Sequence, residues 1–134
     1  MIPSHLTKRR KGATGSGWLG IWNREMEIEI TDYKGIKVIA PSGDIDMYSS
    51  PALREEMIYL IKKRVTPLLI DFRGVSYIDS SGIATFVEGL KAMMAYGGRL
   101  KLTGISEGIM EIFSFSKLDR VFEIYRTIDD AINS

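Results

Sequence analysis

The chain has no cysteine, one histidine and no long apolar run among its 134 residues. Without cysteine there is no disulfide, no thiolate metal site and no cysteine nucleophile. The single histidine, His5, lies in a polar N-terminal stretch, which removes a Ser-His-Asp triad and a multi-histidine metal site from consideration. We therefore expect a protein that is not an enzyme and that has neither a metal site nor a cofactor.

Apolar residues are plentiful but dispersed. The composition is 45% hydrophobic and 26% charged, which is ordinary for a globular protein, and the length suffices for a single core. The most apolar part of the N-terminal region, GWLGIW, is too short and too rich in glycine for a signal peptide. This pattern predicts one folded domain without direct membrane insertion.

Residues 1–25 differ from the rest of the chain in charge and regularity. They carry five basic side chains against one acidic side chain, a net charge of +4, whereas the remainder carries thirteen against sixteen, a net charge of −3. A KRRK run, a Gly/Ser-rich stretch and the lack of periodicity predict a flexible basic leader over residues 1–25. Four charges on such an arm are usually solvated, so we expect no nucleic-acid partner. The folded domain is predicted to span residues 26–134.

Apolar patterning predicts the strands. MEIEITDY, from Met26, alternates apolar and charged residues, and IKVIAP follows a tight turn at Lys34 and Gly35, so the two segments should form a hairpin. LLIDF is almost wholly apolar, as is typical of a strand buried on both faces of a parallel sheet. RLKLTG and a short segment ending at Tyr125 complete the predicted strands.

Helical periodicity separates these strands. Ser50 as N-cap and Pro51 as the first helical residue predict a helix after the second strand. Another helix is predicted to begin near Asp79 or Ser80. Its expected apolar stripe consists of Ile83, Phe86, Val87, Leu90 and Met94.

Two further helices are predicted over residues 107–115 and 127–134, and Phe113 and Phe115 are both expected to be buried. The resulting order is β-β-α-β-α-β-α-β-α. Alternation of strands and helices predicts an α/β fold with a mixed, mainly parallel sheet and helices packed on it.

The stretch YIDSSGIATF, residues 77–86, places an acid, two hydroxyls and a glycine where a strand ends and a helix begins. Asp and Ser side chains at such a position accept hydrogen bonds from the free N–H groups of the first turn. A hydroxyl on a helix N-terminus is also a favourable position for a phosphate. Both interpretations stay open at this point.

Topology bears on this question. Crossovers through a helix are nearly always right-handed, so the strands ending at Pro41 and Phe72 should run parallel. They would deliver GDID and DSSG to the same end of the sheet, where such folds bind their partners. Asp44, Asp46 and Ser80 are therefore expected to be neighbours.

Three segments resemble the STAS domain of bacterial anti-sigma factor antagonists: GDIDMYSSPALREEM, DFRGVSYIDSSGIATFVEGLKAM and GGRLKLTGISEGIMEIFSFSKLDRVFEIY. The resemblance spans residues 26–134, and the DSSG core with its flanks is fairly specific. It implies a cytoplasmic partner-switching module, in which the unmodified antagonist binds an anti-sigma factor that is also a serine kinase and so releases a sigma factor. Phosphorylation of a serine in DSSG ends that binding, and a phosphatase resets the switch.

The same resemblance implies roles for individual residues. The phosphoacceptor is the serine directly after the acid, Ser80, with Ser81 as the fallback. Asp46 matches the acid that lies beside this serine in family members, and Asp44 matches a position that is acidic or polar there. The expected partner-binding residues are Asp44, Asp46, Tyr48, Ser49, Asp79, Ser80, Ser81 and Gly82.

Two other functions stay open. A STAS scaffold or accessory subunit, in a stress-sensing complex or with a lipid transporter, would dock constitutively without a phosphoswitch. A small enzyme or anion-binding protein would use the helix N-terminus at Ser80 for a ligand phosphate, although no histidine, cysteine or phosphate-binding lysine lies nearby in the sequence. Gly82 weakens its helix by about 1 kcal/mol relative to alanine, which close approach of another chain would explain.

Overall fold

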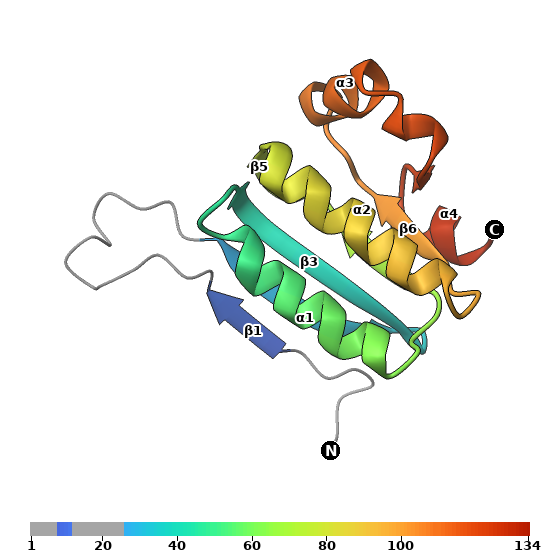
Figure 1. Ribbon diagram of the computed structural model, residues 1–134. Coiled ribbons are helices and arrows are strands. Elements are labelled where there is room, and N and C mark those ends of the chain that lie inside the picture. The colour runs from blue at the N-terminus through green and yellow to red at the C-terminus, as the bar shows by residue number, and fades with distance from the viewer. Residues whose placement is uncertain (1–7, 12–25) are drawn as a thin grey trace.

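Figure 1 shows the computed structural model of the chain, which describes residues 8–11 and 26–134. The elements are, in order, β1 Lys8–Lys11, β2 Glu27–Tyr33, β3 Ile36–Ile45, α1 Ser50–Lys62, β4 Leu68–Asp71, β5 Gly74–Ile78, α2 Ser80–Met94, β6 Leu100–Thr103, α3 Glu107–Phe115, β7 Glu123–Tyr125 and α4 Ile128–Ile132. A single turn of 3-10 helix, Leu118–Arg120, follows α3.

The described strands form one sheet in the order β1-β2-β3-β4-β6-β7. The first two pairs in this order are antiparallel and the others are parallel. β5 lies outside this path because it pairs in parallel with the second half of β3, whereas β4 pairs with the first half. Consequently β3 and β5 end side by side, with Ile45 opposite Ile78.

Helices α1 and α2 lie side by side over one face of the sheet, and α4 covers part of the opposite face (Figure 1). The main core lies under α1 and α2. A row of buried aromatic rings runs through it in the order Phe86, Phe72, Phe113 and Phe122, with successive ring centroids 5.1, 6.1 and 5.8 Å apart. Aromatic pairs contribute about 0.5 to 1.5 kcal/mol beyond their buried area, so this row ties α2 and α3 to the sheet.

The predicted α/β class is confirmed, as are the mixed, mainly parallel sheet and the helices packed on it. Two strands were not predicted. β5 follows β4 after only two residues, and only Val75 and Ile78 of its five residues are buried, so its apolar pattern is weak. β1 falls within the predicted leader.

Strand β1 pairs antiparallel with β2, in a register that sets Arg9 opposite Glu29 and Lys11 opposite Glu27. The basic run that was predicted to be flexible therefore contains a four-residue edge strand. The remainder of the predicted leader, residues 1–7 and 12–25, lies outside the described residues.

Three local predictions were wrong. The N-cap position of α1 is Ser49, one residue before the predicted Ser50. Met94 is 65% exposed, because the buried side of α2 runs to Met93 instead. Phe115 is 94% exposed. It lies two residues after the buried Phe113, about 200° around the helix, so the two rings cannot face the same core.

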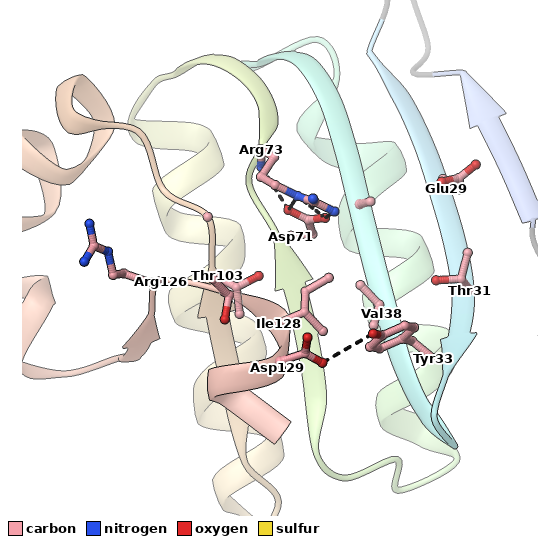
Figure 2. Close-up of a pocket in the computed structure, with 13 residues that line it drawn as sticks. Glu29, Thr31, Tyr33, Val38, Asp71, Arg73, Thr103, Arg126, Ile128 and Asp129 are labelled. Atoms are coloured by element: carbon pink, nitrogen blue, oxygen red, sulfur yellow. Dashed lines mark hydrogen bonds and ion pairs between the residues drawn. The ribbon is translucent and has the colours of Figure 1, made fainter. Parts of the chain in front are cut away.

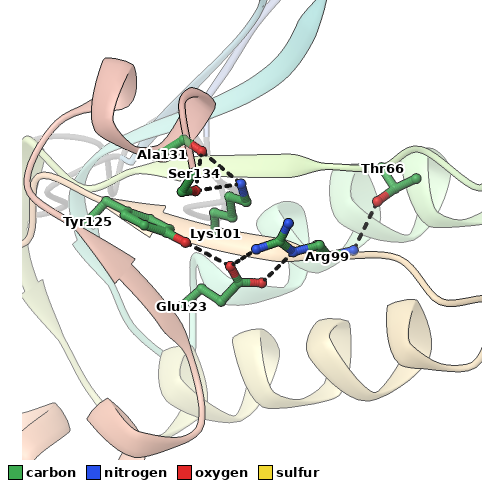
Figure 3. Close-up of polar contacts among 7 residues, drawn as sticks. All are labelled: Thr66, Arg99, Lys101, Glu123, Tyr125, Ala131 and Ser134. Carbon is green, nitrogen blue, oxygen red and sulfur yellow. Dashed lines mark hydrogen bonds and ion pairs between the residues drawn. The ribbon is translucent and has the colours of Figure 1, made fainter.

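A buried lysine fastens α4 to the sheet (Figure 3). Lys101, in β6, is 2% exposed, and its ammonium donates hydrogen bonds to the carbonyl of Ala131 at 2.7 Å and to Oγ of Ser134 at 3.0 Å. Carbonyls in the last turn of a helix lack intrahelical partners, and the helix dipole favours a cation there. Lys101 therefore satisfies the end of α4, while burial lowers the pKa of its ammonium group.

Replacing Lys101 by methionine should change how stability depends on pH. Because the pKa of Lys101 is lower in the folded chain than its ordinary value of 10.5, the unfolded chain binds more protons between the two values. The free energy of unfolding of the unsubstituted chain should therefore rise, relative to Lys101→Met, as the pH increases through the folded pKa toward 10.5. Urea denaturation of both proteins over that range measures the difference, and a difference independent of pH would contradict the assignment.

Candidate functional site

Two loops meet where β3 and β5 end. The register sets Ile45 opposite Ile78, and the N–H of Asp79 donates to the carbonyl of Ile45 at 3.0 Å. Across the gap, the N–H of Met47 donates to Oδ2 of Asp79 at 3.2 Å. The prediction that GDID and DSSG lie at the same end of the sheet is confirmed. We call the surface formed by residues 46–49 and 77–82 the DSSG face.

Asp79 caps helix α2. Its Oδ1 accepts hydrogen bonds from the N–H groups of Ser81 at 2.8 Å and Gly82 at 3.1 Å, and its backbone is extended, as an N-cap requires. Ser80 is the first helical residue and is exposed. Among the residues that the structure describes, none hydrogen-bonds the Ser80 hydroxyl. Capping therefore accounts for Asp79 and leaves Ser80 unexplained.

Ser81 and Gly82 face the protein more than Ser80 does. Ser81 is half-buried, and Gly82 is buried. A Cβ atom at Gly82 would lie 2.6 Å from Cγ1 of Ile78 and 2.7 Å from Cγ2 of Ile45, so only glycine fits there. The chain's own two strands thus explain this glycine, and no approach by another chain is needed.

The loop between β3 and α1 is held by its own polar groups. Oδ1 of Asp46 accepts from the N–H groups of Tyr48 at 2.9 Å and Ser49 at 3.0 Å. The Ser49 hydroxyl donates to the carbonyl of Asp44 at 2.7 Å and accepts from the N–H of Asp46 at 2.9 Å. Asp44 and Ser49 are 7% and 3% exposed, so they lie beneath the surface on which they were predicted to contact a partner.

Three large side chains in the segments that form the DSSG face are exposed. Tyr48 is 71% exposed, Met47 62% and Tyr77 51%. Aromatic and methionine side chains are enriched at protein interfaces relative to the rest of a surface. Sequence reasoning named Tyr48 but missed Met47 and Tyr77. Strand alternation was the available signal for Tyr77, because it points away from the core when its neighbour Ile78 points inward.

The part of the chain that the structure describes contains neither a cluster of metal-binding side chains nor a membrane-spanning helix. No group of three or more His, Cys, Asp or Glu side chains in this part of the chain is placed to hold a metal ion. Within the same residues, no helix is both long and apolar enough to cross a membrane.

The division of roles between Asp79 and Ser80 predicts different effects on stability. Asp79→Ala removes the acceptor of two helix N–H bonds and should lower the free energy of unfolding by about 0.5 to 2 kcal/mol. Ser80→Ala is the matched control and should leave it within about 0.5 kcal/mol, because the hydroxyl is exposed and unbonded. Urea denaturation measures both. An equal loss for the two variants would mean that Ser80 takes part in the cap.

A comparison with known families defines the class of this fold. The model of the STAS domain family matches residues 27–131. The chain therefore belongs to the STAS domain family.

Relatives with a similar sequence include anti-sigma factor antagonists. An anti-sigma-B factor antagonist of Bacillus subtilis strain 168 is 37% identical over 83 residues, which cover 62% of this chain and 75% of the relative. One from Listeria monocytogenes is 32% identical over 103 residues, covering 76% and 89%. The phosphorylated form of the Bacillus cell fate determinant SpoIIAA superposes with a TM-score of 0.60 at 25% identity, covering 75% and 91%. The resemblance inferred from the sequence is confirmed.

Proposed function

We propose that this protein is a cytoplasmic anti-sigma factor antagonist that switches partners through Ser80. Its unmodified form binds an anti-sigma factor with serine kinase activity through the DSSG face and so frees a sigma factor. Phosphorylation of Ser80 ends that binding, a phosphatase restores it, and the chain itself catalyses no reaction. The observation that carries the proposal is the exposed Ser80 hydroxyl, which the helix does not use for its own cap.

Accessibility favours Ser80 over Ser81 as the phosphoacceptor. A kinase must bring its catalytic groups to the hydroxyl oxygen, which requires an exposed side chain. Ser80 is exposed, whereas Ser81 is half-buried and its carbonyl accepts the Thr85 hydroxyl at 3.0 Å. The relatives' names and the existence of a phosphorylated form of SpoIIAA support a switch of this type.

The surface around Ser80 suits a protein partner. Met47, Tyr48 and Tyr77 offer exposed apolar area in the segments that form the DSSG face, and the carboxylates of Asp46 and Asp79 lie in the same segments. An interface of this kind combines apolar contact with a few polar groups that fix its orientation. In this proposal the buried Asp44 and Ser49 do not contact the partner. They stabilise the 46–49 loop through the hydrogen bond from the Ser49 hydroxyl to the carbonyl of Asp44.

A phosphate on Ser80 would change the surface without unfolding the domain. The phosphoryl group adds about −1.5 to −2 charges at neutral pH. At the first residue of α2 it would meet the positive end of the helix dipole, which favours an anion by typically about 0.3 to 1 kcal/mol. The cap on Asp79 would stay in place, because it does not involve the Ser80 hydroxyl.

The partner, in contrast, would lose affinity. A surface complementary to a neutral hydroxyl would have to bury a dianion next to the carboxylate of Asp79. Burying a charge without a new cation costs several kcal/mol. Like charges brought together across an interface add to that cost. Release of the partner therefore requires no conformational change in the antagonist.

Ser80→Asp should mimic the modified state in binding. Relative to the unsubstituted chain, its affinity for the purified anti-sigma factor of the native host should fall at least about tenfold, because a charge enters the interface. Ser80→Ala should bind as tightly as the unsubstituted chain. Ser114→Asp adds the same charge at an exposed position on α3 and serves as the matched control, with unchanged affinity.

Isothermal titration calorimetry of the four proteins measures these affinities. Binding that is equal in all four would reject the switch. It would favour the other function that the fold allows, a constitutive STAS scaffold or accessory subunit.

A further inference from the structure

A hollow in the surface lies apart from the DSSG face, because none of the residues of that face lines it. It has a volume of about 430 Å³, within the range of small-molecule sites. It lies between the β6–α3 connection, α3 and the end of β7. The residues that line it are Gly104, Ile105, Met110, Ile124, Tyr125, Arg126 and Thr127.

The walls of this hollow are mainly apolar and fixed in place. Ile105, Met110 and Ile124 are half-buried and pack against the main core. The Tyr125 hydroxyl is held by the carboxylate of Glu123 at 2.9 Å. A ligand therefore meets a preformed apolar surface, which does not need to reorganise on binding.

One charged side chain lines the hollow, that of Arg126. It is exposed, and no described residue forms an ion pair or a hydrogen bond with its guanidinium. Arg54, Arg73 and Arg99 differ, because each is paired with a carboxylate. A guanidinium without a partner is suited to bind a carboxylate or another oxyanion through two parallel N–H bonds.

The neighbouring hollow on the other side of Arg126 differs in charge. It has a volume of about 370 Å³ and contains Asp71, paired with Arg73, and Asp129, paired with Lys34. Figure 2 shows the guanidinium of Arg126 pointing away from the Asp71–Arg73 pair. Arg126 lines both hollows, but its guanidinium points away from this ion pair, so we place its unpaired charge in the apolar hollow.

We propose that the apolar hollow at Arg126 binds a small organic anion, with its carboxylate or similar oxyanion on the guanidinium and its apolar body against Ile105, Met110 and Ile124. The inference goes beyond the proposed function, because it uses none of the residues of the DSSG face. A body that is apolar along its length fits the three aliphatic walls, and a single negative charge matches the single cation.

The probe for this site is 4-phenylbutyrate, which joins a carboxylate to a short apolar body. Titrated into the full chain labelled with nitrogen-15, it should produce saturable shifts of the amide signals of residues 104–105 and 124–127. Arg126→Gln should weaken binding at least about tenfold, the effect of losing one charged hydrogen-bonding partner. Arg120→Gln removes the same charge from an exposed arginine that does not line the hollow, and it should bind as the unsubstituted chain does.

Two further measurements test separately how much the carboxylate and the apolar body of the probe contribute to binding. The neutral analogue 4-phenylbutanol should bind at least about tenfold more weakly than the acid. Met110→Trp, which fills the hollow and keeps Arg126, should abolish binding while thermal unfolding confirms that the variant is folded. Equal affinity for the acid and the alcohol, binding that survives Arg126→Gln, or shifts confined to another part of the chain would each overturn the proposal.

Discussion

The parallel pairing of β3 with β5 is the constraint on which the rest of the site depends. It sets Ile45 opposite Ile78 and is extended by the hydrogen bond from the N–H of Asp79 to the carbonyl of Ile45. Because both strands end at the same level, the 46–49 loop and the start of α2 are fixed against each other. Gly82 allows the first turn of α2 to lie directly on these two isoleucines, where any side chain would clash.

This arrangement separates two tasks that could have fallen on one side chain. Asp79 accepts hydrogen bonds from the N–H groups of Ser81 and Gly82 at the start of α2, so the hydroxyl of Ser80 is not needed for the helix cap. A helix start that relied on the serine would lose its cap on modification. Here a phosphate would change only the charge of the surface, which is the property that a partner reads. In the proposed function, the exposed Met47, Tyr48 and Tyr77 would supply the contact area that such a charge disrupts.

Much of the fold could be predicted from the sequence, because period 2 and period 3.6 patterns separate clearly after Met26. The two strands that were not predicted, β5 and β1, form because of their pairing with other strands in the folded chain. β5 was missed because its five residues, GVSYI, bury only Val75 and Ile78, which are three positions apart and so do not show the period 2 of a strand. β1 was missed because a run of four basic residues is typical of a solvated arm, and only the register against Glu27 and Glu29 gives it a partner strand.

The site was predictable in outline for a related reason. Topology alone brings GDID and DSSG together, and the resemblance to anti-sigma factor antagonists indicated Ser80. Burial was not predictable residue by residue. Asp44 and Ser49 lie beneath the face they were expected to form, because the loop closes over its own hydrogen bonds. The exposure of Met47 follows from the shape of that loop, which has no periodic signal.

The most direct test of the account is the phosphate occupancy of the tryptic peptide spanning residues 74–91, measured by mass spectrometry on protein purified from its native host in growth and under stress. The account predicts an occupancy that differs between the two conditions and maps to Ser80. A peptide that is unmodified in every condition, while the protein keeps the same partners throughout, would contradict it.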